Sequence, residues 1–312
     1  MSSLLILGTR GSALARWQAS HTQALLQAAG HAVAIEEFTT KGDRVLDVPL
    51  AEIGDKGLFT QELDAALLAG EIHLAVHSLK DLPTTLPEGL VLAAITERAA
   101  PWDAFVAHPR FEGQLSDLPE GATLATSSLR RKAQLLAWRP DLHIIPVRGN
   151  VDTRLRKLDA SDWHGVILAE AGLGRLGLQK RIRQRFPLDI MIPAVSQGAL
   201  GVVCAASDTA TRDVLHDTLN HVITRATSTA ERAFLRRLEG GCQAPIGAYA
   251  HVDAEHQLSL HGCVASLDGS VLIREQIVGG MANAEVLGTA LAERILEQGA
   301  AVVLSNIRQA KG

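Results

Sequence analysis

The feature that most constrains this chain is an alternation of strand-like and helix-like segments over its first 78 residues. The segments follow one another at 4–8, about 12–29, 32–38, about 59–69 and 72–77. Gly30 and Gly70 end the two helices, as glycine commonly does. Because strands joined through helices pair in parallel, this order predicts a parallel sheet with helices on both faces.

The same alternation restarts near residue 104 and predicts a second parallel α/β unit. Its strands and helices are expected at 104–107, 123–126, 128–138, 144–147, 151–158 and 165–169. A further apolar run at 201–206 is expected to return the chain to the first sheet, by analogy with two-lobed binding proteins.

The character of the sequence changes beyond about residue 218. A helix at about 228–238 precedes three strand-like runs and a helix at 282–297, and Asp268-Gly269 is a hairpin signal. The predicted fold class is α/β, with two periplasmic-binding-protein-like lobes and a small C-terminal α+β domain that contains a three-stranded antiparallel sheet. The predicted domains are 1–97 with 198–217, 98–197, and 218–312.

Composition excludes several classes of protein. The apolar runs are far shorter than the roughly 20 residues of a membrane span, and the N-terminus lacks the basic region of a signal peptide, so we expect a cytoplasmic protein. The cysteines, at 204, 242 and 263, form no CxxC pair, and the 12 histidines show no ligand spacing. We expect no metal, and we expect Cys204 and Cys263 to be buried and inert.

The charge is distributed unevenly. Residues 130–185 contain 13 Lys and Arg against 5 Asp and Glu, a net +8, in a chain whose formal charge is -4. The excess of arginine over lysine has codon bias as its simpler explanation, but this concentration predicts an anionic partner.

Three strand-to-helix junctions carry polar and basic side chains where parallel sheets bind ligands. They are Arg10 to Ser12, Thr126-Ser127-Ser128 before Arg130 and Arg131, and Arg148 to Asn150 before Arg154. Helix N-termini attract anions, although ordinary capping is an equal alternative for any one junction. The chain has no phosphate-binding glycine loop and only 11 aromatic residues, so nucleotides and nucleic acids are disfavoured and a small polycarboxylate is expected.

Longer motifs, in order along nearly the whole chain, resemble those of porphobilinogen deaminases (hydroxymethylbilane synthases). They include TRGSALARWQA, LAVHSLKDLP, TSSLRRKAQL, RGNVDTRLRKL, PAVSQGALG and EGGCQAPIG. The chain departs from the family pattern at Ser196, where glycine is common, and at Gly174, where a larger residue is common.

The resemblance implies a monomeric transferase of porphyrin, tetrapyrrole and heme biosynthesis. Such an enzyme joins four porphobilinogen molecules head-to-tail on a dipyrromethane cofactor, held by a thioether to Cys242, and releases hydroxymethylbilane by hydrolysis. The catalytic residues would be Asp81, which supplies the carboxylate, and Lys80 beside it. The alternative is a non-catalytic two-lobed module that binds a small polycarboxylate.

The resemblance also implies which side chains bind the acetate and propionate groups of the pyrroles. Those implied for the cofactor are Lys80, Asp81, Thr126, Ser127, Ser128, Arg130, Arg131 and Arg148. Those implied for the substrate are Arg10, Ser12, Arg148, Arg154 and Arg175. The glycine-rich stretch from about Val45 to Gly57 is predicted to be a mobile flap.

Overall fold

The computed structural model describes residues 4–40, 60–238 and 244–309. The chain forms two compact units, one of residues 1–99 with 198–225 and one of residues 100–197 with 226–312. None of the described helices combines the length and apolarity needed to cross a membrane.

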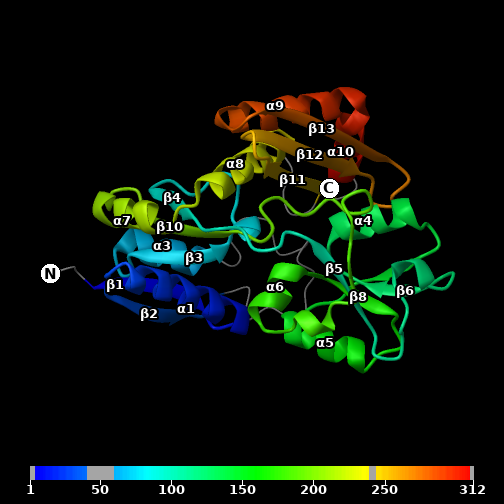
Figure 1. The fold of residues 1–312 in the computed structure, drawn as a ribbon, viewed down its shortest axis with the longest axis horizontal. Coiled ribbons are helices and arrows are strands. Elements are labelled where there is room, and N and C mark those ends of the chain that lie inside the picture. Colours follow the sequence, from blue (N-terminus) through cyan, green and yellow to red (C-terminus); the bar gives the residue numbers. More distant parts are fainter. Residues whose placement is uncertain (1–3, 41–59, 239–243, 310–312) are drawn as a thin grey trace. The chain divides into compact units, whose positions relative to one another are not determined.

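The first unit is built on a five-stranded sheet of order β2-β1-β3-β10-β4 (Figure 1). The strands are β1 Leu5–Arg10, β2 Val33–Phe38, β3 Leu74–Ser78, β4 Leu90–Ile95 and β10 Leu200–Ala205. The predicted return of the chain to this sheet is confirmed, since β10 lies between β3 and β4. The prediction of an all-parallel sheet is wrong there, because β10 runs antiparallel to both neighbours. The chain reaches β10 by a long connection and not by a helical crossover, so the rule that makes crossover-connected strands parallel does not apply to it.

Helices cover both faces of this sheet, as predicted. They are α1 Ala13–Ala28, α3 Gln61–Ala69 and α7 Thr209–Leu219. Apolar residues of α1 and α7, among them Leu26 and Leu215, pack with Leu7 in one core cluster. Leu63 and Leu67 of α3 belong to a second cluster. The sequence patterns missed α7 and β4.

The second unit contains a five-stranded sheet of order β7-β6-β8-β5-β9. The strands are β5 Asp103–Ala107, β6 Thr123–Ala125, β7 His143–Ile145, β8 Gly165–Ala169 and β9 Gln184–Arg185. Only β7, β6 and β8 are mutually parallel, whereas β5 runs antiparallel to β8 and β9, so the all-parallel prediction is wrong here as well. The long apolar run of β5 shows that it is buried on both faces but does not show its direction.

Helices again lie on both faces of this sheet. They are α4 Leu129–Trp138, α5 Val151–Asp159 and the short α6 Glu170–Arg175, which was not predicted. Side chains of β5 alternate between two core clusters: Phe105 packs with Leu135 of α4, and Val106 packs with Leu158 of α5.

The same unit contains an antiparallel sheet of β11 Ile246–Val252, β12 Gln257–Ala265 and β13 Leu272–Gly280. Its helices are α8 Val222–Arg237, whose first residues up to Arg225 belong to the first unit, α9 Ala284–Ile295 and α10 Ala301–Gln309. Phe234 of α8, Leu260 of β12 and Leu291 of α9 lie together in its core. The predicted fold class is confirmed, since two five-stranded sheets accompany a small three-stranded one. The division into three domains stays a prediction.

Candidate functional site

In the first unit, two neighbouring strand ends bring four predicted residues to one edge of the sheet. Strands β1 and β3 pair in parallel, with Gly8 opposite Ala75. Arg10 ends β1, and a 3₁₀ turn of Leu79–Asp81 directly follows β3. Ser12 caps α1, accepting a hydrogen bond from the backbone N–H of Ala15 at 3.3 Å.

The turn after β3 is held in place by burial and by hydrogen bonds. Leu79 is completely buried, and its N–H donates to the carbonyl of Ala199 at 3.0 Å. Ser78 accepts a hydrogen bond from Gln18 at 2.7 Å. Lys80 is half-buried and Asp81 is exposed, so the carboxylate predicted to be catalytic reaches solvent. Its neighbours fix the backbone that carries it.

His77, the last buried residue before this turn, was not predicted to belong to the site. It is 7% exposed, and its Nε2 has no hydrogen-bond partner among the residues the structure describes. Burial, together with the charge of Arg10, lowers the pKa of His77 to about 4. The imidazole is therefore neutral at pH 7, beside a guanidinium.

In the second unit, the predicted Thr126-Ser127-Ser128 segment forms the junction between β6 and α4. Ser128 caps α4, accepting from the N–H of Arg131 at 3.4 Å, and Thr126 Oγ1 accepts from the N–H of Ser128 at 3.2 Å. The Ser127 hydroxyl donates to the carbonyl of Val147 at 2.7 Å and accepts from its N–H at 3.0 Å. Through these hydrogen bonds the three hydroxyl groups fix the backbone of the junction, independently of any contact with a ligand.

Arg130 and Arg131 lie inside the unit, where both pair with Asp103. Arg130 Nη1 donates to Asp103 Oδ2 at 2.7 Å, and Arg131 Nε donates to Oδ1 at 2.8 Å. Arg130 and Arg131 are 5% and 6% exposed. Gln197 Nε2 also donates to Asp103, at 3.1 Å. Sequence reasoning missed Asp103 and Gln197, because these contacts join residues 27 and 94 positions apart.

The arginine pair decides the charge of Asp103. Burial alone would raise the pKa of this carboxyl, but the charges of Arg130 and Arg131 and the hydrogen bonds of Arg130 and Gln197 outweigh it and hold the pKa well below its usual range. One carboxylate thus faces two guanidinium groups, which leaves a net positive charge beneath the start of α4.

The other predicted arginines of this unit are half-buried. Arg148 follows β7, and Arg154 of α5 donates from Nε to the carbonyl of Gly149 at 2.8 Å. Gly149 has a φ of 112°, a conformation that favours glycine. Arg175 ends α6, and burial lowers its pKa to about 10, which still leaves it charged at neutral pH.

Two predicted features lie outside the described residues, namely Cys242 and the stretch from Val45 to Gly57. The other two cysteines behave as predicted. Cys204 and Cys263 are buried free thiols, and burial raises the pKa of each to about 11. Across residues 4–40, 60–238 and 244–309, no group of three or more His, Cys, Asp or Glu side chains could hold a metal ion.

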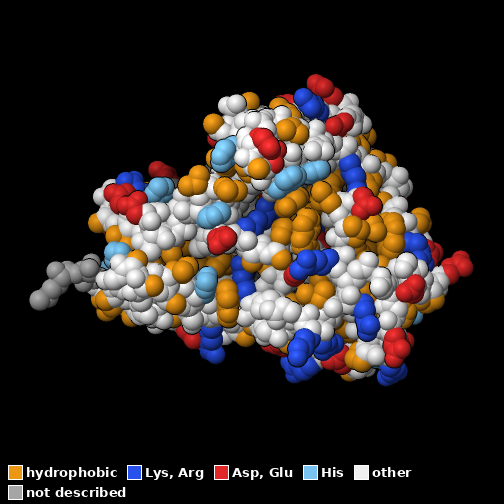
Figure 2. Space-filling model, in the orientation of Figure 1, with side chains coloured by type: hydrophobic (Ala, Val, Ile, Leu, Met, Phe, Trp, Pro, Cys, Tyr) orange, Lys and Arg blue, Asp and Glu red, His pale blue; other side chains and the backbone are white. Residues whose placement is uncertain are grey.

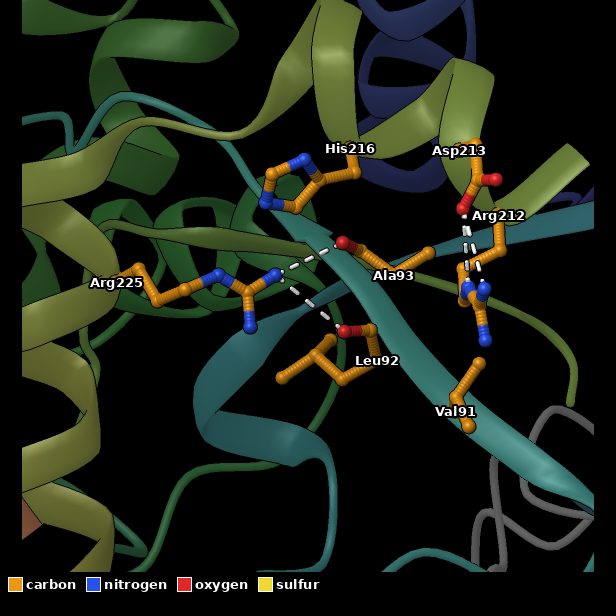
Figure 3. A pocket seen from close by; sticks show the side chains of 7 residues that line it. All are labelled: Val91, Leu92, Ala93, Arg212, Asp213, His216 and Arg225. Atoms are coloured by element: carbon orange, nitrogen blue, oxygen red, sulfur yellow. Dashed lines mark hydrogen bonds and ion pairs between the residues drawn. The ribbon is translucent and has the colours of Figure 1, made fainter. Parts of the chain in front are cut away.

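A cavity of about 340 Å³ in the first unit contains none of the predicted residues (Figure 3). Arg225 reaches across it from α8 and donates to the carbonyl of Ala93 in β4 at 2.8 Å. Arg212 is turned toward Asp213, at 3.2 Å. The guanidinium of Arg225 therefore connects α8 to β4.

Two family models match the chain. One, described as porphobilinogen deaminase, dipyromethane cofactor binding domain, matches residues 5–213, and the other, porphobilinogen deaminase, C-terminal domain, matches residues 225–297. The chain belongs to the porphobilinogen deaminase family. The resemblance in sequence motifs is thereby confirmed, and so is the expectation of a dipyrromethane-binding domain.

Relatives named porphobilinogen deaminase match over nearly their whole length. The protein of Desulforudis audaxviator is 52% identical over 97% of this chain and 98% of its own. That of Carboxydothermus hydrogenoformans is 48% identical over 99% of both chains, and that of Synechococcus elongatus is 50% identical over 96% and 94%. Among solved structures, the methionine binding protein MetQ is 14% identical, with a TM-score of 0.45, over 69% of this chain and 89% of its own.

One face of this member of the porphobilinogen deaminase family is mixed in charge (Figure 2). On the face drawn in Figure 2, Lys and Arg side chains of the described residues are interspersed with Asp and Glu. Asp159 pairs with Arg181 and Glu170 with Arg185, but these carboxylates are already counted in the net +8 of residues 130–185, so the pairs leave that excess in place. Among the described residues, the carboxylate that pairs with the buried Arg130 and Arg131 is Asp103, which lies outside this segment.

Proposed function

We propose that this protein deaminates porphobilinogen, condenses four molecules of it head-to-tail and releases hydroxymethylbilane by hydrolysis. The observation that carries the proposal is the match to both family models together with the Asp81 turn at the end of β3. We further infer a cytoplasmic monomer that acts on a small molecule and binds neither nucleic acid nor membrane. On the face drawn in Figure 2, Lys and Arg are interspersed with Asp and Glu and are not gathered in a basic patch, which supports the part of this inference that concerns nucleic acid.

Asp81 is assigned the role of acid, base and electrostatic partner. Loss of ammonia from porphobilinogen leaves a cation, and a fixed carboxylate stabilises positive charge as it develops. An exposed carboxylate on an anchored turn suits this role, because the substrate reaches the group while Leu79 holds the backbone in place. Lys80 is assigned to a substrate or cofactor carboxylate nearby.

The arginines are assigned to the acetate and propionate groups. Guanidinium forks bind carboxylates through two parallel hydrogen bonds, and helix N-termini add a favourable field. Arg10, Ser12, Arg148, Arg154 and Arg175 are assigned to the substrate. The cofactor set is Lys80, Asp81, Thr126, Ser127, Ser128, Arg130, Arg131 and Arg148. Because Arg130 and Arg131 already share Asp103, we assign them a mainly electrostatic contribution to carboxylate binding.

The residues present fit a dipyrromethane, since that group carries four carboxylates and half-buried arginines bind such groups well. When bound, it supplies the carbon to which the first substrate is joined. Cys242 is assigned as its thioether anchor. Cys204 and Cys263, buried with pKa values raised to about 11, are unsuited to that role.

Intact mass and peptide mapping of the purified protein test the proposal. We expect the mass of one dipyrromethane above that of the polypeptide, located on the peptide with Cys242, and a coloured product with acid Ehrlich reagent. A polypeptide mass without adduct, together with no consumption of porphobilinogen, would favour the alternative of a polycarboxylate-binding module.

A further inference from the structure

Glu231, in the middle of α8, is a completely buried carboxylate. Its Oε2 accepts the backbone N–H of Ser196 at 2.5 Å, and its Oε1 accepts the backbone N–H of Ala250 at 2.7 Å. Hydrogen bonds to an ionised acceptor are shorter and stronger than neutral ones. One side chain therefore joins three segments that lie far apart in sequence.

Two of these segments flank the predicted cofactor cysteine in the sequence. Helix α8 ends at Arg237, and β11, which contains Ala250, begins at Ile246. Cys242 lies between them in the chain. Glu231 thus links α8, which precedes this cysteine, to β11, which follows it, through the hydrogen bond from Ala250.

The third segment leads toward the arginine pair. Ser196 is followed by Gln197, whose Nε2 donates to Pro101 O at 2.7 Å and to Asp103 Oδ1 at 3.1 Å. Asp103 holds Arg130 and Arg131. Glu231 is therefore connected to both guanidinium groups through its hydrogen bond to Ser196, the covalent bond from Ser196 to Gln197, and the hydrogen bonds of Gln197 and the two arginines to Asp103.

A second connection runs parallel to the first. Arg130 Nη1 donates to the carbonyl of Ile192 at 2.8 Å, and the carbonyl of the next residue, Pro193, accepts from the N–H of Ala248 in β11 at 3.0 Å. Residues 192–197 are thus held by the arginine pair on one side and by β11 and α8 on the other.

We propose that Glu231 is a positioning residue for the reaction, which keeps the elements on either side of Cys242 in register with Arg130 and Arg131. The proposal rests on the function proposed above. If the cofactor is anchored at Cys242 and its carboxylates depend on the arginine pair, then a shift of the elements around Cys242 or of the arginine pair changes the position of the cofactor. Glu231 acts through these residues.

Glu231→Gln tests the proposal, because it preserves shape while placing an amide group against one of the two N–H donors. Glu285→Gln is the matched control on α9, since Glu285 is exposed and pairs with Arg236. Ile295→Val is a second control, chosen to loosen the same apolar core without changing a hydrogen bond. Gln197→Ala interrupts the connection at a different point and serves if Glu231→Gln fails to fold.

Hydrogen exchange gives a readout that does not depend on catalysis. We expect Glu231→Gln to lower protection in peptides covering 192–197, 246–252 and 126–134, and Glu285→Gln to leave all three unchanged. In the holoenzyme we expect at least a 10-fold lower kcat, with intermediates accumulating at particular chain lengths, whereas Ile295→Val keeps its rate.

Unchanged protection of 126–134 in Glu231→Gln would overturn the proposal, as would a rate equal to that of Ile295→Val at equal melting temperature. A wild-type protein without the cofactor mass would instead contradict the proposed function, and the exchange data would still decide whether Glu231 couples these segments.

Discussion

Arg130 donates hydrogen bonds from both terminal nitrogens to the carboxylate of Asp103, at 2.7 and 3.2 Å. Arg131 pairs with the same carboxylate at 2.7 Å, and all three side chains are buried. Asp103 is therefore the group that allows two adjacent arginines to remain charged inside the protein. If one member of such a cluster loses its charge, the remaining charges stay buried without an opposite charge to offset the cost of their desolvation.

We expect Asp103→Asn to lower the free energy of unfolding by about 3–5 kcal/mol. The pKa of Asp103 is depressed in the folded state, so its contribution is complete above the unfolded-state pKa of roughly 3.9 and is lost as the pH falls further. Urea denaturation at several pH values measures both effects.

Asp159→Asn is the control for Asp103→Asn, because Asp159 forms an exposed ion pair with Arg181 and should contribute at most about 1 kcal/mol. Equal effects of the two substitutions would show that the buried cluster adds nothing to stability.

Arg148→Lys keeps the charge of this half-buried side chain but removes the planar fork. A hydrogen bond to a charged group contributes about 1.5–3 kcal/mol, so we expect kcat/KM to fall by about 10- to 100-fold. Enzyme-bound intermediates, resolved by native mass spectrometry, should accumulate at particular chain lengths. Arg183→Lys is the exposed control, and an unchanged rate and ladder in Arg148→Lys would contradict its assignment to a carboxylate.

Local patterns in the sequence were enough to locate the junctions of the candidate site. Ser12, Ser128 and Asn150 each cap a helix, as a short polar residue before a helical period predicts. Arg10 and the Leu79–Asp81 turn lie at the ends of adjacent parallel strands, as the βαβ pattern predicts. These features depend on residues only a few positions apart.

Contacts between distant segments could not be predicted in this way. The pairing of Asp103 with Arg130, the clamp of Glu231 on Ser196 and the antiparallel direction of β10 all depend on tertiary packing. Nothing in the apolar run of β5 distinguishes Asp103 from an ordinary residue at the start of a strand. Asp103 becomes the partner of two arginines only in the folded protein, where it is buried.

The buried His77 predicts a dependence of stability on pH. Its pKa is about 4 in the folded protein, lowered by burial and by Arg10, against roughly 6.5 in an unfolded chain. Between these values the unfolded state binds a proton that the folded state does not, so stability falls as the pH drops from roughly 6.5 to 4, by about 3 kcal/mol in total.

His77→Gln should remove that part of the slope, measured as the free energy of unfolding between pH 4 and pH 7. His216→Gln, which changes an exposed histidine, should leave the slope in place. A slope that survives His77→Gln intact would mean that other groups cause it.

Ser196 departs from the family motif at a position with a φ of 59°, in the left-handed region that favours glycine. Its hydroxyl is buried and has no hydrogen-bond partner among the described residues. Replacing Ser196 by glycine relieves roughly 1–2 kcal/mol of backbone strain and also removes the buried hydroxyl. Together these gains exceed the entropic cost of glycine, which is roughly 0.5–1 kcal/mol. We expect Ser196→Gly to stabilise the protein by about 1 kcal/mol.

Differential scanning calorimetry should show this gain as a rise in Tm of about 1–2 °C. Ser196→Ala removes the hydroxyl but keeps the strained φ, so it should recover only part of the gain. A Tm for Ser196→Gly at or below that of the wild type would show that the serine is accommodated without strain.

Asp81→Asn tests the catalytic assignment itself. The substitution keeps the shape of the side chain but removes the negative charge that is proposed to face a developing cation, and loss of one preorganised electrostatic partner typically lowers the rate about 10²- to 10³-fold. Because Asp81 is exposed and the turn is anchored by Leu79, we expect the Tm to be unchanged. Single-turnover rates of holoenzyme, with thermal melting alongside, measure both quantities.

The matched control is Asp213→Asn. It removes an exposed carboxylate of the same unit whose partner, among the described residues, is the adjacent Arg212. It should change neither rate nor Tm, since an exposed ion pair contributes at most about 1 kcal/mol. An Asp81→Asn enzyme that carries its cofactor, melts like the wild type and retains most of its rate would place Asp81 with Asp213, as a solvated surface charge outside the mechanism.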